Sequence, residues 1–167
     1  MWAIKKLDST DYFAVKRLFQ EVFDLTEDTY LASAWRKRTS EKSLGVWHSE
    51  GPLLAAAIVR GNFLEYIFVS PHAQGEGLGT ILLQHVMRLS PAIHLTPVND
   101  DRVIRWYERH GFQLTRRDGD RCVYSRRPWI LRSTTRLLAH GFYNCRQAQT
   151  HPEKKPAFAD RSDTIPA

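Results

Sequence analysis

The chain has 167 residues, of which 43% are hydrophobic, and this suits a single domain with an apolar core. No segment approaches the run of about 18 apolar residues that crosses a membrane, and the first residues lack the apolar stretch of a secretory signal. We therefore expect no transmembrane helix and an intracellular, cytoplasmic protein.

The net charge of +6 is unevenly distributed along the sequence. Residues 1–125 carry a net charge of only +1, whereas residues 126–146 contain five arginines and no acidic residue. Residues 147–167 are dominated by polar residues and proline, a composition typical of disorder. We therefore divide the chain into a main domain over 1–127, a basic amphipathic extension over 128–146 and a disordered tail over 147–167.

The cysteine and histidine positions in the sequence predict neither a disulfide nor a metal site. The two cysteines, Cys122 and Cys145, lie on either side of the basic segment, and we expect both to be reduced thiols. No closely spaced pair of Cys or His residues has zinc-binding spacing, so no metal site is expected.

The N-terminal third predicts a strand, two helices and a hairpin. Residues 2–7 alternate weakly between apolar and polar, as in a strand, and the cluster 8–11 is typical of a helix N-cap. The helix behind it ends near Asp24, with a buried face made of Phe13, Ala14, Leu18, Phe19, Val22 and Phe23. A second, shorter helix begins at Thr26 or Glu27, and strands over 43–48 and 53–59 follow as a hairpin.

The rest of the main domain predicts alternating strands and helices. After a buried strand over 63–69, a helix runs from Leu78 to Leu89, and a strand over 92–98 follows it. A strand, helix and strand in this order imply a parallel pair with a right-handed crossover. Asn99 or Asp100 caps a helix that stops at Gly111, and strands over 112–116 and 121–125 form a last hairpin.

The loop between the 63–69 strand and the next helix is glycine-rich and suits a phosphate. Backbone N–H groups at a helix start have no intrahelical partner, and the helix dipole adds positive charge there. A dinucleotide-binding motif is excluded because Thr80 stands where its third glycine belongs, and a P-loop is excluded because no lysine follows.

Two motifs together indicate whose phosphate the loop holds. The segment from Leu64 to Gly79, with Gln74, Gly77 and Gly79 at their spacing, resembles the acetyl-CoA motif of the GCN5-related N-acetyltransferase (GNAT) superfamily. Residues 106–112 resemble its second signature, a tyrosine and an acid followed by Gly-Phe. The resemblance covers residues 1–127 and implies an α+β fold: a twisted, mostly antiparallel sheet of about seven strands with one parallel pair and helices on both faces.

The resemblance also implies a set of acetyl-CoA-binding residues. The backbone of Ile67, Phe68 and Val69 would bind the pantetheine arm, and a second group would wrap the pyrophosphate: Gln74, Gly75, Glu76, Gly77, Leu78, Gly79 and Thr80. In the family an asparagine seven residues before the tyrosine contacts the pantetheine arm, but this position is Asp100 here. Either Asn99 restores the contact through a one-residue offset, or Asp100 is only an N-cap and the contact is lost.

Tyr107 and Glu65 are the candidate catalytic residues. A phenol is protonated at neutral pH, so Tyr107 could protonate the departing thiolate, the role that the resemblance implies; the alternative is a buried core aromatic. Glu65 shares the apolar face of its strand with Phe63, Ile67 and Val69, and a carboxylate there needs a solvated site or a cationic partner. It is therefore either the base, direct or through water, or the partner of a cation on a neighbouring strand. His94 is the second candidate base.

The function expected from these residues is transfer of an acetyl group from acetyl-CoA to a primary amine by direct attack in a ternary complex. A non-catalytic acyl-CoA-binding module and an acetyltransferase acting on aminoacyl-tRNA or a protein amine are the alternatives. The basic segment 126–146 could pack on the core or on a second copy in a homodimer, bind nucleic acid or tRNA, or touch an anionic membrane surface. The acceptor is not identified by the sequence.

Overall fold

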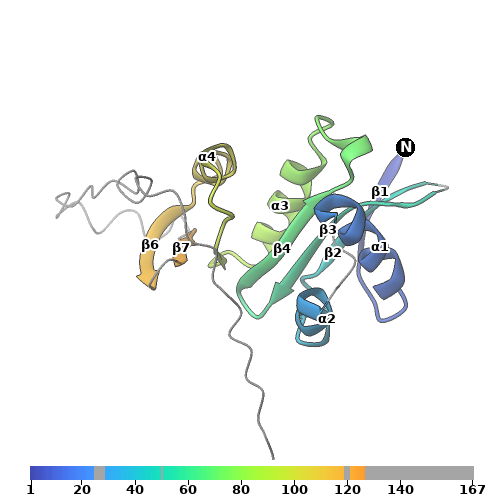
Figure 1. Ribbon diagram of the computed structural model, residues 1–167, viewed down its shortest axis with the longest axis horizontal. Helices are drawn as coiled ribbons and strands as arrows, with labels where there is room; N and C mark the ends of the chain where they lie inside the picture. The colour runs from blue at the N-terminus through green and yellow to red at the C-terminus, as the bar shows by residue number, and fades with distance from the viewer. Residues whose placement is uncertain (25–28, 50, 119–120, 127–167) are drawn as a thin grey trace, which may run out of the picture. The chain divides into compact units, whose positions relative to one another are not determined.

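The computed structural model describes residues 1–24, 29–49, 51–118 and 121–126. These residues form a seven-stranded sheet in the order β1-β2-β3-β4-β5-β7-β6 (Figure 1). The strands are β1 (Trp2–Lys6), β2 (Leu44–His48), β3 (Leu53–Arg60), β4 (Phe63–Val69), β5 (His94–Leu95), β6 (Gln113–Asp118) and β7 (Arg121–Ser125). The helices are α1 (Tyr12–Phe23), α2 (Thr29–Arg36), α3 (Leu78–Leu89) and α4 (Asp101–Arg109), with a short 3₁₀ turn, η1 (Pro71–Ala73), before α3.

The predicted mixed sheet is confirmed. Neighbouring strands pair antiparallel except β4 and β5, which pair in parallel through Phe63 with His94 and Leu64 with Leu95. No helix among the described residues is long and apolar enough to cross a membrane. The extension 128–146 and the tail 147–167 lie outside the described residues, so those two expectations stay predictions.

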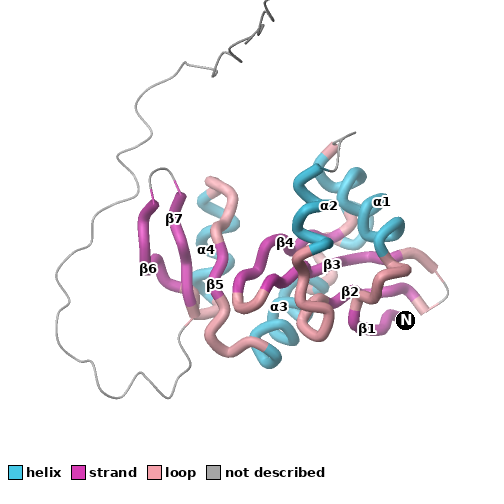
Figure 2. The backbone as a smooth tube through the Cα atoms, turned by 90° about the horizontal axis from the view of Figure 1, so that it is seen from below, coloured by secondary structure: helices cyan, strands magenta, loops and turns pink. Residues whose placement is uncertain are grey.

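The sheet separates two apolar cores. Helices α1 and α2 lie side by side against β3 on one face (Figure 2), where Val15, Phe19 and Leu31 pack with Ile58 and Phe68 of the sheet. On the other face, Leu82, Val86 and Tyr107 of α3 and α4 pack against residues of β2, β3 and β4. We call these the α1 face and the α3 face.

The buried face of α1 differs from the prediction. Val15, Leu18 and Phe19 are buried, whereas Phe13 is 79% exposed. Residues three and four apart share a helix face, and Phe13 does not keep that spacing with Val15, Leu18 or Phe19.

A β-bulge at Glu65 changes the alternation of β4. Ile58 of β3 pairs with Tyr66, but the next residue, Val59, pairs with Leu64, so Glu65 has no opposite partner. As a result Leu64 packs on the α3 face together with Ile67 and Val69, while Tyr66 and Phe68 pack on the α1 face. The expectation that Glu65 shares one continuous face with Phe63, Ile67 and Val69 was therefore wrong, because the extra residue shifts the pattern by one.

The strand β5 is much shorter than predicted. Only His94 and Leu95 belong to the sheet, although residues 92–98 read as a strand. Pro97 has no N–H to donate to a neighbouring strand, and the bulge at Glu65 bends β4 at the point where the parallel pairing stops. The two strands therefore separate beyond Leu64 and Leu95.

Gly45 provides a stability test of the sheet. A β-carbon there would lie 2.8 Å from both Leu53 Cδ1 and Leu7 Cδ2. We expect Gly45→Ala to lower the free energy of unfolding by about 1–3 kcal/mol, because overpacking displaces core side chains. Urea denaturation measures this, with Gly51→Ala as the control, since its nearest contact is 3.4 Å and a change within about 0.5 kcal/mol is expected. Equal effects of the two variants would contradict tight packing at Gly45.

Candidate active site

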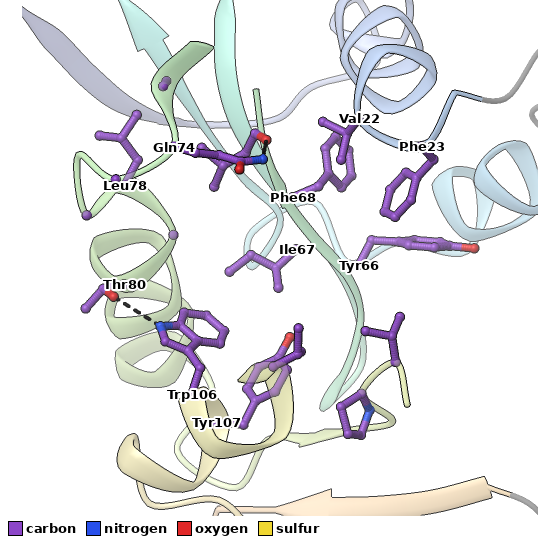
Figure 3. Close-up of a pocket in the computed structure, with 18 of the residues that line it drawn as sticks. Val22, Phe23, Tyr66, Ile67, Phe68, Gln74, Leu78, Thr80, Trp106 and Tyr107 are labelled. Atoms are coloured by element: carbon purple, nitrogen blue, oxygen red, sulfur yellow. Dashed lines mark hydrogen bonds between the residues drawn. The ribbon is translucent and has the colours of Figure 1, made fainter. Parts of the chain in front are cut away.

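A cavity of about 780 Å³ occupies the separation between β4 and the segment after β5. On the α3 face it is lined by Leu78, Trp106 and Tyr107, and on the α1 face by Val22 and Tyr66 (Figure 3). Because its lining comes from both cores, the cavity runs through the sheet. Two molecules could therefore meet in it from opposite faces.

The glycine loop and the start of α3 form one end of the cavity. Gly75 and Gly77 have φ angles of 88° and 78°, conformations that favour glycine, and Gly77 is the N-cap of α3. The first helical hydrogen bond runs from Ile81 N to Gly77 O at 3.0 Å, so the N–H groups of residues 78–80 have no intrahelical acceptor. This end of the cavity suits an anion.

The edge of β4 beyond the bulge offers further backbone groups. Ser70 N donates to Leu54 O at 2.7 Å, which makes Ser70 and Leu54 a hydrogen-bonded pair. In an antiparallel sheet such pairs recur at every second residue, so Phe68 of β4 is also hydrogen-bonded to β3. The N–H and C=O groups of Ile67 and Val69 therefore point the other way, toward the cavity. The phenyl ring of Phe68 lines the cavity instead, while its backbone faces Ala56.

Tyr107 lies on α4 with only 6% of its surface exposed. Its ring packs against Trp106 and Phe112, with centroid distances of 4.7 and 5.5 Å. Its hydroxyl has no hydrogen-bond partner among the described residues. Tyr107 lines the cavity beside Trp106 (Figure 3).

Burial raises the pKa of Tyr107 well above the ordinary phenol value. The hydroxyl therefore stays protonated, and able to donate, throughout the neutral range. In the unfolded chain the phenol ionises near pH 10, as free tyrosine does. The stability linked to Tyr107 is thus fully present below about pH 10 and is lost as the pH rises further.

This linkage predicts a difference between the wild type and Tyr107→Phe. Between about pH 9 and pH 11 the free energy of unfolding should fall more steeply for the wild type, because only the wild type keeps a proton at position 107 that the unfolded chain releases. The pKa of Tyr66 is also raised, but that group is common to both proteins and cancels. Urea unfolding at the two pH values measures the slopes, and parallel slopes would contradict the burial of an intact phenol.

Glu65 lines the cavity and is paired at the same time. Its Oε1 accepts a hydrogen bond from Nε of Arg60, at the end of the neighbouring strand β3. The cation on a neighbouring strand, one of the two alternatives for Glu65, is therefore present. Glu65 is the one charged side chain among the described residues that line the cavity.

Three of the expected binding residues lie outside the cavity lining: Glu76, Asn99 and Asp100. Asp100 is the N-cap of α4, since its carboxylate accepts from Arg102 N at 2.7 Å and also pairs with the Arg102 guanidinium. His94 lies outside as well, at the start of β5, where its Nδ1 is 2.6 Å from Ser125 Oγ. The remaining expected binding residues, Ile67–Val69, Gln74, Gly75 and Gly77–Thr80, all line it.

The chain matches known acetyltransferases over this region. A family model described as an acetyltransferase (GNAT) domain matches residues 43–114. Over 115 residues the chain is 30% identical to the peptidyl-lysine N-acetyltransferase YiaC of Escherichia coli (strain K12), and the match covers 65% of this chain and 72% of that protein. The chain belongs to the GNAT acetyltransferase family.

Further relatives agree with this assignment. The peptidyl-lysine N-acetyltransferase YjaB of Salmonella typhimurium (strain LT2) is 26% identical over 112 residues, 60% of this chain and 75% of that one. Among solved structures, the Escherichia coli ribosomal-protein-S18-alanine N-acetyltransferase matches with a TM-score of 0.59 at 21% identity, over 75% of this chain and 91% of its own. Arabidopsis thaliana Naa50, in complex with a bisubstrate analogue, matches with a TM-score of 0.58 at 19% identity, over 74% of this chain and 95% of its own. These two similarities concern the fold.

Several residues of this GNAT cavity were not predicted from the sequence to belong to the site. Trp106 closes the side between α3 and α4, and its Nε1 donates to Thr80 Oγ1 at 3.4 Å (Figure 3). Val22 and Phe23 come from the end of α1, which is tied to the end of β4 where Ser70 Oγ donates to Glu21 Oε1 at 2.8 Å. The segment after β5 adds Thr96, Pro97 and Val98. Pro97 could have indicated from the sequence that the strand ends before this segment, because a proline argues against continuing an internal strand.

Proposed function

We propose that the chain transfers an acetyl group from acetyl-CoA to a primary amine by direct attack within a ternary complex. The observation that carries this proposal is the cavity lined from both apolar cores, with the start of helix α3 at one end and a protonated tyrosine in its lining. The donor would occupy the α3 face and the acceptor would approach from the α1 face.

The residues present fit acetyl-CoA as the co-substrate. The unpaired N–H groups of Leu78, Gly79 and Thr80 would hold the pyrophosphate, with Gly75 and Gly77 giving the loop its conformation. The backbone of Ile67 and Val69 would pair with the amide groups of the pantetheine arm, as an added strand does. When bound, acetyl-CoA supplies the thioester that the amine attacks.

Two side chains would move protons in this reaction. The new N–C bond forms as the C–S bond breaks, so the amine must lose a proton and the departing thiolate gains from one. Tyr107 would give its proton to the sulfur. Glu65, directly or through water, would take one proton from the ammonium, because a lysine-like amine is almost wholly protonated at neutral pH. The second proton, which the nitrogen loses as the amide forms, would replace the one that Tyr107 gives to the sulfur.

The lining on the α1 face favours a lysine-type acceptor. Val22, Phe23 and Tyr66 offer apolar and aromatic surface to an alkyl stem, and Glu65 offers one carboxylate for one ammonium. The curated relatives YiaC and YjaB are named peptidyl-lysine N-acetyltransferases, which supports the same acceptor class.

A screen of free-thiol release from acetyl-CoA tests the proposal. The panel holds a blocked peptide with one lysine, a peptide with a free N-terminus, a diamine, an amino acid and an aminoglycoside. We expect the highest kcat/KM with the lysine peptide. Binding of CoA without thiol release in the presence of any amine would overturn the proposal in favour of a non-catalytic binding module.

A further inference from the structure

The ion pair between Arg60 and Glu65 is held at the acceptor end of the cavity. Both residues flank the β3–β4 turn, which is fixed where Lys42 Nζ donates to Gly61 O at 2.9 Å and to Asn62 Oδ1 at 2.8 Å. The Arg60 side chain is 52% exposed and the Glu65 side chain is 21% exposed. The backbone of Arg60 is therefore anchored while its guanidinium remains in contact with solvent.

The pair lies on the α1 face of the sheet. Val59 packs on the α3 face and Ile58 on the α1 face, so alternation along β3 places Arg60 on the α1 face. The Glu65 carboxylate reaches Arg60 from the bulge and so lies on the same side. The charge of Glu65 also contributes, after burial, to raising the pKa of Tyr66, a lining residue of that face.

The charges at this end balance before any substrate arrives. Glu65 is the one charged side chain among the described lining residues, and Arg60 already neutralises it. A single ammonium that enters could share or take the carboxylate, because Arg60 contributes only one nitrogen, Nε, to one oxygen and its side chain is half exposed. A second positive charge on the acceptor has no carboxylate in the described lining and meets the guanidinium.

We propose that Arg60 is a specificity-determining residue that selects acceptors with one isolated ammonium against acceptors with a second cation nearby. This assignment rests on the proposed function. Arg60 acts through Glu65 and through repulsion, without contact with the reacting atoms. Two like charges about 6–9 Å apart near a protein surface, screened by physiological salt, lower the affinity by about three- to tenfold.

Two matched peptides test the assignment. Each is blocked at its N-terminus and holds one lysine, with glutamine on both sides of the lysine in the first and arginine on both sides in the second. The measurement is the ratio of kcat/KM for the first peptide over the second. For the wild type we expect a ratio of about three to ten, and a smaller ratio at high salt because exposed charges are screened.

The variants separate this role from a structural one. In Arg60→Gln the ratio should fall to one or below, because the unpaired Glu65 carboxylate then attracts the extra cations. In Arg60→Lys the ratio should return, since an ammonium can replace a single-nitrogen contact and keeps the positive charge. Arg102→Gln is the control, because Arg102 is an exposed arginine paired with Asp100 outside the cavity lining, and it should keep the wild-type ratio. Melting curves establish that each variant is folded.

Each outcome bears on one of the two proposals. A wild-type ratio near one, or a ratio that Arg60→Gln leaves unchanged, would overturn the role of Arg60 while the enzyme still acetylates peptides. A wild type that releases no thiol with either peptide or with the amine panel would overturn the proposed function, and with it this assignment.

Discussion

Tyr107→Phe is expected to lower kcat by about 10²–10⁴-fold with little change in KM for acetyl-CoA. The substitution removes only the hydroxyl, the group proposed to protonate the departing thiolate, and keeps the ring that packs against Trp106 and Phe112. Steady-state kinetics with a lysine peptide measure both constants.

Tyr124→Phe is the matched control for this variant. Tyr124 is a buried tyrosine of the same apolar core, 3% exposed, but it does not line the cavity. Its variant should keep kcat within about threefold of the wild type, as expected for a residue outside the chemical step. An unchanged kcat for Tyr107→Phe, or equal losses in the two variants, would remove Tyr107 from the reaction.

Gly77→Val is expected to raise KM for acetyl-CoA by about tenfold or more while changing kcat much less. Gly77 has φ of 78° at the N-cap of α3, and a β-branched residue is strained in that conformation by about 1–3 kcal/mol. Relief of this strain would turn the N–H groups of residues 78–80 away from the position where they would meet the pyrophosphate.

Gly61→Val separates this effect from a loss of stability. Gly61 also has a positive φ, 60°, and a β-carbon at either glycine would meet nothing within 4 Å, but Gly61 lies in the β3–β4 turn outside the cavity lining. Both variants should lose a similar free energy of unfolding, and only Gly77→Val should lose affinity for acetyl-CoA. Equal KM values in the two variants would exclude the loop as the phosphate site.

Local sequence patterns were sufficient to predict the loop and the helix start that line one end of the cavity. Gly75, Gly77 and the helix start at Leu78 act through backbone conformation, which a short motif specifies, and the structure places them at one end of the cavity. The tyrosine signature likewise lies within one helix and the turn after it, so Tyr107 could be chosen as a candidate residue without knowing the sheet. The same local reasoning placed Asp100 as an N-cap.

The part of the cavity at the β4 bulge depends on contacts between distant segments, and local patterns do not specify these. The bulge at Glu65 is a matter of register between β3 and β4, and alternation alone placed Glu65 on the wrong face. The pairing of Glu65 with Arg60 follows from that register. Predicting the early end of β5 would have required both the bulge and Pro97. Beyond that point β4 and the segment after β5 separate, and the cavity lies between them.

The most direct test of the central claim follows an isotope-labelled acetyl group. The wild type is incubated with labelled acetyl-CoA and a blocked peptide that holds one lysine, and the peptide is sequenced by mass spectrometry; the same peptide with arginine in place of lysine is the control. We predict label on the lysine side chain, none on the control peptide, and a strongly reduced yield with Tyr107→Phe. Acetyl-CoA that binds at the cavity but leaves no label on any amine would contradict the account.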